Sequence, residues 1–73
     1  MRDDRRVFVK MIVDLLNTES NANLLMTEEF GGQIGIVRTK PDGSFSTDDW
    51  INLEGYNTLG ILRCIMNAVE DII

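Results

Sequence analysis

The stretch LLMTEEFGGQIGIVRTKPDGSF, residues 24–45, contains four of the six glycines and the only proline of a 73-residue chain. Its middle part, residues 33–40, is rich in β-branched side chains, and Gly35 disfavours a helix there, so this part predicts a strand. The sequence KPDGS at residues 40–44 predicts a hairpin turn after that strand. Proline presets φ, aspartate bonds to nearby backbone, and glycine accepts a positive φ.

The segment before these glycines, residues 24–30, has two interpretations. As a strand it pairs with residues 33–40 across Gly31 and Gly32, which can supply the two positive φ angles of a tight hairpin. As a short helix it ends at the same glycines, because glycine commonly follows a helix C-terminus. We favour the strand.

The glycines also invite comparison with phosphate-binding loops. Residues 32–35, GQIG, match the G-x-x-G of the KH fold, in which a loop between two helices clamps a nucleic-acid backbone and basic residues lie near it. Here Glu28 and Glu29 precede the loop and a β-branched run follows it. The P-loop and dinucleotide fingerprints are absent. We therefore predict turn and strand-packing roles, and no ligand role, for Gly31, Gly32 and Gly35.

The flanking segments complete the predicted fold. Residues 4–17 have the apolar spacing of a helix, with Leu15 on its apolar side and Asp4 as N-cap. Residues 45–53 predict a returning strand, and a last helix capped by Asn57 or Thr58 runs to the chain end. The prediction is one small α+β domain, residues 1–73, in which an N-terminal and a C-terminal helix cover one face of a three-stranded antiparallel meander and leave the other face uncovered for a partner. The order is α-β-β-β-α, with α-α-β-β-α as the alternative.

The composition indicates a folded chain without covalent or metal crosslinks. Val, Ile, Leu and Phe make up 23 of 73 residues, more than in disordered chains. Cys64 has no second cysteine, and the chain contains no histidine, which excludes the usual zinc sets. Neither a secretion signal nor a bilayer-spanning apolar run is recognisable. We expect a cytoplasmic protein whose single thiol is packed.

Charge divides the chain into two halves. Residues 1–40 carry six acids and six bases, whereas residues 41–73 carry six acids and only Arg63, so the net charge of −5 lies in the second half. Such an acidic surface repels phosphate backbones and anionic lipids, which argues against nucleic-acid and membrane partners. It favours a basic protein partner, although acids also serve simply to keep a small protein soluble.

The sequence offers no recognisable catalytic or metal centre. A calcium loop starting at Asp42 would need glycine where Thr47 stands and glutamate where Leu53 stands. Nucleophile-and-base pairs lack histidine, and Cys64 lies on the flank of the last helix. We predict no enzymatic activity, no metal and no cofactor; an enzyme or nucleotide-binding protein is the minor alternative.

Two functional classes follow. The first is a binding module of the kind found among small inhibitory or accessory proteins of bacteria and phages, although no motif supports that likeness. Trp50 is expected to project from the sheet face opposite the helices, beside acids, as an interface anchor or as a cover for the sheet edge or the last helix. The residues predicted to bind a basic partner are Asp48, Asp49, Trp50 and Tyr56.

The second class is a self-associating assembly subunit. The apolar arc of the last helix is wider than one core contact requires, because three residues extend it to about 180°. Either the first helix or a second copy of the chain could cover the extra width. The residues predicted for self-association are Leu59, Met66 and Ile73.

Overall fold

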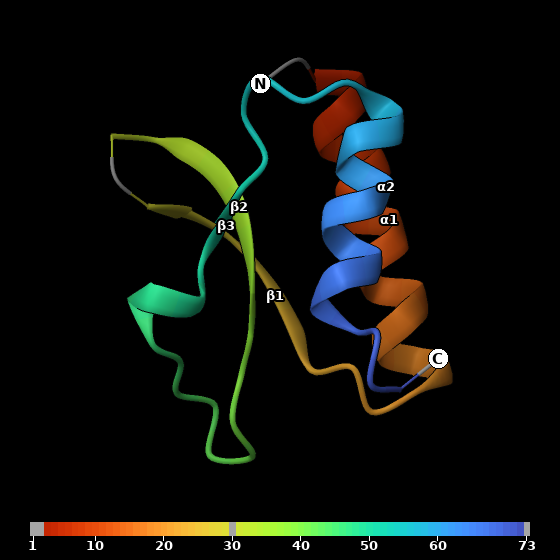
Figure 1. Cartoon of the computed structure of the whole chain (residues 1–73), viewed down its shortest axis with the longest axis vertical. Helices are drawn as coiled ribbons and strands as arrows, with labels where there is room; N and C mark the ends of the chain where they lie inside the picture. The colour runs from red at the N-terminus through yellow and green to blue at the C-terminus, as the bar shows by residue number, and fades with distance from the viewer. Residues whose placement is uncertain (1–2, 30, 73) are drawn as a thin grey trace.

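The computed structural model describes residues 3–29 and 31–72 and has two layers, with both helices on one side of a three-stranded sheet (Figure 1). The predicted α-β-β-β-α fold is therefore confirmed. The elements in chain order are α1 (Asp3–Glu19), β1 (Leu24–Glu29), β2 (Gln33–Arg38), the 3-10 helix η1 (Thr47–Asp49), β3 (Ile51–Asn52) and α2 (Thr58–Ala68).

The sheet is antiparallel, with β2 in the centre between β1 and β3. The register between β1 and β2 runs from Leu24 opposite Arg38 to Glu29 opposite Gln33. Gly31 and Gly32 have φ angles of +84° and +82°, which only glycine adopts at low cost. Residues 24–29 therefore form the strand and not the short helix; residue 30 lies outside the described residues.

The third strand is much shorter than residues 45–53, so that prediction is wrong in its bounds. The turn before it forms as expected, since the Gly43 N–H donates to the Lys40 carbonyl at 2.8 Å. The Ser46 hydroxyl then accepts a hydrogen bond from the Asp48 N–H at 3.2 Å and begins η1. A serine side chain that bonds to nearby backbone competes with strand pairing, and the pairing with β2 is limited to residues 51–52 and the bond from the Leu53 N–H to the Ile34 carbonyl.

Helix α1 is longer than the predicted residues 4–17. Asp4 lies inside the helix and is not its N-cap. Asn17 does not end the helix either. Its side-chain amide donates to the Leu24 carbonyl and its side-chain oxygen accepts from the Leu24 N–H, both at 2.8 Å. Asn17 thereby fixes where the chain leaves α1 and enters β1.

Helix α2 begins as predicted and ends early. The Asn57 side chain caps it by accepting from the Gly60 N–H at 2.8 Å. The helix stops at Ala68 and does not reach the chain end, and tighter turns follow it. Glu70 and Asp71 stand just beyond this end, where the helix dipole disfavours acids.

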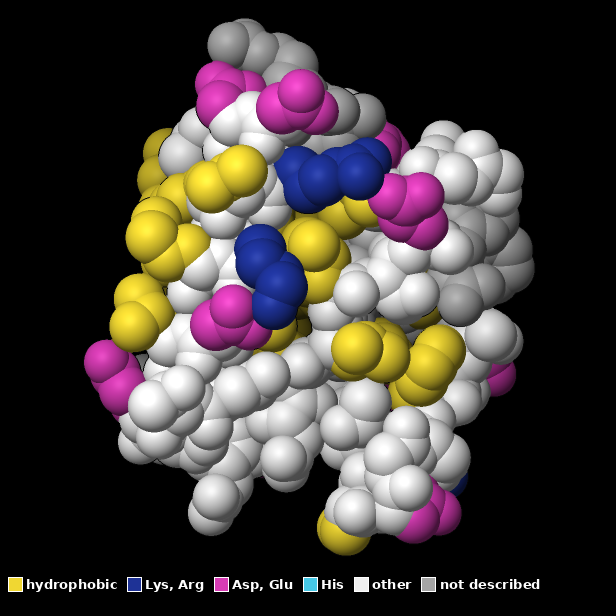
Figure 2. Space-filling model, turned by 180° about the vertical axis from the view of Figure 1, so that it is seen from behind, with side chains coloured by type: hydrophobic (Ala, Val, Ile, Leu, Met, Phe, Trp, Pro, Cys, Tyr) yellow, Lys and Arg dark blue, Asp and Glu magenta, His cyan; other side chains and the backbone are white. Residues whose placement is uncertain are grey.

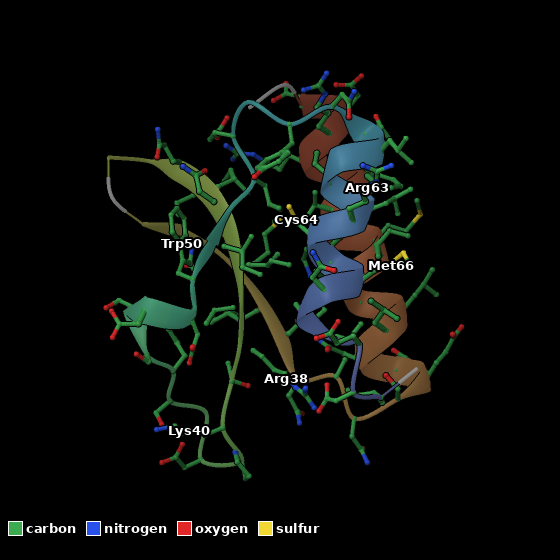
Figure 3. The ribbon with its side chains drawn as sticks, in the orientation of Figure 1. Arg38, Lys40, Trp50, Arg63, Cys64 and Met66 are labelled. Atoms are coloured by element: carbon green, nitrogen blue, oxygen red, sulfur yellow. The ribbon has the colours of Figure 1, made fainter. Side chains whose placement is uncertain are left out.

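The core lies between the helical layer and the sheet. Helix α1 packs against β1, and α2 packs against β2. Cys64 packs against this core from α2, as expected for a structural thiol, and points toward the sheet (Figure 3). The buried members of the cluster are Val9, Val13, Ala22, Leu24, Ile36, Leu53, Ile61, Ile65 and Val69.

Candidate functional site

Helix α1 carries a second apolar stripe besides the one that enters the core. Val7, Met11 and Leu15 recur every four residues, so they lie above one another on one side of the helix. Their side chains remain 65%, 52% and 48% exposed. The prediction that Leu15 faces the core is therefore wrong, because Val9 and Val13 define the buried side. The stripe is therefore mainly exposed to solvent.

Helix α2 continues the exposed apolar surface. Leu59 and Met66 are seven residues apart on one side of α2 and are 60% and 56% exposed. Ala68, on nearly the opposite side of α2, lines a hollow together with Ile51 of β3. Because α1 packs over β1 and α2 over β2, the side of α2 away from β3 is turned toward α1.

We call these five residues, Val7, Met11, Leu15, Leu59 and Met66, the helical face. Hydrophobic side chains gather along the outer edge of the helical layer in Figure 2, and Figure 3 shows Met66 on the side of α2 away from the sheet. Two of the three residues predicted for self-association belong to it; the third, Ile73, lies outside the described residues. Sequence reasoning missed Val7 and Met11, although their four-residue spacing with Leu15 was a usable signal.

Charged side chains follow the flank of α1 that is turned toward β1. Arg6 pairs with Glu28 of β1 at 3.0 Å, and Lys10 pairs with Asp14 at 2.8 Å within the helix. All four side chains are about half exposed. This flank and the apolar stripe border a shallow hollow of about 590 Å³, whose floor includes Met26. Beside this hollow the bases therefore precede the acid along α1, while the first turn of the helix is also acidic.

On the opposite side of the molecule, the chain itself covers the central strand β2. The Trp50 indole lies against Gly35 so closely that a Cβ built on Gly35 would be 2.2 Å from Trp50 Cε2. Val37, on the same sheet face as Gly35, is only 1% exposed. The expectation of an uncovered sheet face is thus wrong over β2. Trp50 is half-buried and sits on the far side of the sheet from the helices (Figure 3).

The four residues predicted to bind a basic partner do not form one cluster. Asp48 and Asp49 are exposed in η1, next to Trp50. Tyr56 instead lies at the helical end of the molecule. Its carbonyl accepts a hydrogen bond from Arg5 Nη1 at 2.7 Å, and its ring lies against Gly60 at the start of α2.

Among the described residues, two carboxyl groups have pKa values below their ordinary values. The Ser44 hydroxyl donates to Asp42 at 2.6 Å and the Ser44 N–H donates at 2.9 Å, and these bonds lower the pKa of the Asp42 carboxyl. The Ile34 N–H donates to Glu54 Oε1 at 3.0 Å and lowers the pKa of Glu54, although partial burial acts in the opposite direction. Both groups stabilise turns next to the sheet.

Within residues 3–29 and 31–72, no three Cys, Asp or Glu side chains are grouped so that they could hold a metal ion. Over the same residues, no helix has the length and apolar character needed to cross a membrane. Neither a scan of protein-family models nor searches of curated proteins and solved structures found a match to this chain.

Proposed function

We propose that this chain is a small protein-binding module that acts through the helical face. The observation that carries the proposal is the exposure of five large apolar side chains on the outer side of two packed helices. Soluble monomers rarely leave apolar side chains gathered in one place, and such patches commonly mark protein contacts. Methionines at this position also suit a contact surface, because the unbranched thioether adapts to irregular neighbours.

A second candidate is binding of a basic protein surface through the acidic η1 region. Asp48 and Asp49 are exposed there, and the contact between Trp50 and Gly35 holds the region against the sheet. This is the arrangement expected of an inhibitory or accessory protein that attracts a cationic partner. Exposed charges mainly raise the rate of association, so this surface needs another contact to hold a complex. We rank it below the helical face.

Affinity capture from the source cells, read by mass spectrometry, separates the two candidates. One bait carries Met11→Glu and Leu59→Glu; the matched control carries Asp48→Asn and Asp49→Asn. Leu59 lies in the first turn of α2, where an acidic residue is compatible with the helix dipole, and circular dichroism checks the fold. We expect the helical-face bait to lose its bound protein about tenfold while the control retains it. The reverse pattern would contradict the proposal and favour the acidic region.

A further inference from the structure

We infer that the helical face binds a second copy of the same chain, with the two α1 helices antiparallel and a two-fold axis near Met11. This inference rests on the proposed function and names its partner. Two features of the face support it: the apolar stripe is symmetric about its middle residue, and the charges beside the hollow change from Arg6 and Lys10 to Asp14 along the helix.

The apolar stripe is self-complementary in this arrangement. With the axis at Met11, Val7 of one copy lies level with Leu15 of the other, and the two Met11 side chains meet at the centre. A two-fold interface needs this property. Every contact between one position in the first copy and another position in the second copy is repeated with the two copies exchanged. The contact covers the three exposed side chains of α1 with apolar neighbours.

The charged flank is also self-complementary. A two-fold axis that lies in the interface across the helices brings the same flank of each α1 together. At a rise of about 1.5 Å per residue, Asp14 of one copy then lies about 3 Å along the axis from Lys10 and from Arg6 of the other. The pair of Lys10 with Asp14 inside each helix becomes part of a network of both signs. In a parallel pair the two-fold axis would instead place the two charged flanks on opposite sides of the contact, where they cannot pair with each other.

Helix α2 extends the contact on the other flank. Leu59 and Met66 are exposed on the side of α2 away from β3, so they extend the apolar contact beyond α1. Exposed Arg63 lies between them in sequence. Its long side chain can extend to the rim, where the guanidinium stays hydrated while the stem covers apolar surface.

A charge-exchange experiment tests the pairing by sedimentation equilibrium of the full chain. Lys10→Glu alone and Asp14→Lys alone place like charges opposite each other in the dimer, and each should weaken dimerisation about tenfold. An equimolar mixture of the two variants restores opposite charges at both contacts, so the mixture should dimerise with wild-type affinity. A merely intrahelical role for Lys10 and Asp14 cannot produce this recovery, because mixing leaves each helix unchanged.

Disulfide trapping supplies a second measurement in a Cys64→Ser background. Met11→Cys should crosslink to itself under mild oxidation. Val7→Cys alone should not, because the two substituted positions are about 12 Å apart along the helices. Val7→Cys mixed with Leu15→Cys should give the crosslinked heterodimer. Circular dichroism checks that each variant is folded.

Recovery in the charge-exchange mixture, together with the Met11→Cys crosslink, is the expected result. A wild-type chain that stays monomeric into the millimolar range overturns the inference. The proposed function survives that outcome if captured proteins still depend on the helical face. A dimer that is indifferent to these substitutions, for example one that pairs through the edge of β1, also overturns it.

Discussion

The two sides of the molecule differ in how much of their apolar surface is covered. On the far side of the sheet, Trp50 folds back on Gly35 and the chain covers its own central strand. On the helical side, the inner stripes of α1 and α2 are buried but an outer stripe is left exposed. A large aromatic residue beside acids therefore need not mark a binding site. The exposed apolar residues at helical spacing, in contrast, are not packed against the rest of the described chain.

The layered arrangement explains the difference. A sheet has two faces that both need a cover, and the helices supply one of them. The segment from the turn to β3 covers the other face over β2. Within residues 3–29 and 31–72, no segment covers the outer side of the helices. Small domains are only marginally stable alone, so a partner on that side adds stability as well as function.

The strongest test of the closed side is Gly35→Ala. The added Cβ meets the Trp50 ring at 2.2 Å, so the indole must leave its position. We expect the free energy of unfolding to fall by about 3 kcal/mol, as for severe overpacking. Urea denaturation followed by circular dichroism measures this loss. In a Trp50→Ala background the same substitution should cost less than about 1 kcal/mol, since the clash is gone. Equal losses in both backgrounds would show that the close packing is not the cause.

Trp50→Ala alone tests the same contact with a smaller expected effect. Removing a fully buried tryptophan costs about 3–5 kcal/mol, and Trp50 is half-buried, so we expect a loss of about 2 kcal/mol. The urea midpoint reports the loss of stability. Unchanged stability together with loss of a bound protein would instead assign Trp50 to an interface and reverse our account of the two sides.

The fold was predictable where local signals were strong. Gly31 and Gly32 adopt the positive φ angles that their hairpin requires, and Gly43 does so in the second turn. The alternation of Ile34 and Ile36 set the central strand. These signals depend on residues near one another in sequence, which is why element order and type were correct.

The remaining features depend on distant or competing contacts. Asn17 bonds to Leu24, and Trp50 packs on Gly35, although no local pattern links either pair. The hydrogen bond from the Asp48 N–H to the Ser46 hydroxyl begins a 3-10 helix where the sequence predicted a long strand. Of the candidate site, Leu59 and Met66 were found from the width of an apolar arc. The spacing of Val7 and Met11 with Leu15 indicates a stripe, but its exposure follows only from knowing which side of α1 is buried.

Acid should weaken the turn that joins β3 to α2. The hydrogen bond from Ile34 holds the folded-state pKa of Glu54 below its ordinary value of 4.5. The unfolded chain therefore binds more protons, so this contribution is present above that value and is lost as pH falls through the lower folded-state pKa. Urea midpoints at about pH 7 and about pH 3 should differ less in Glu54→Gln than in wild type. An amide oxygen still accepts the bond but does not titrate; an identical pH dependence would contradict this role.

We expect the smallest change in the stability of the monomer from a substitution on the helical face. Met66→Ser removes an exposed side chain, so below the dimerisation range it should change the free energy of unfolding by less than about 0.5 kcal/mol. Chemical denaturation of a dilute sample measures it. A loss near 2 kcal/mol in dilute solution would mean that Met66 is packed within one chain.

The most direct test of the contrast between the two sides is a concentration series followed by NMR. The methyl signals of Met11 and Met66 report the helical face, and the indole signal of Trp50 reports the closed side, in one sample. From the low micromolar to the millimolar range we predict that both methionine methyl signals shift together while the Trp50 signal stays constant. A shift confined to Trp50, with the methionine signals unchanged, would contradict the account.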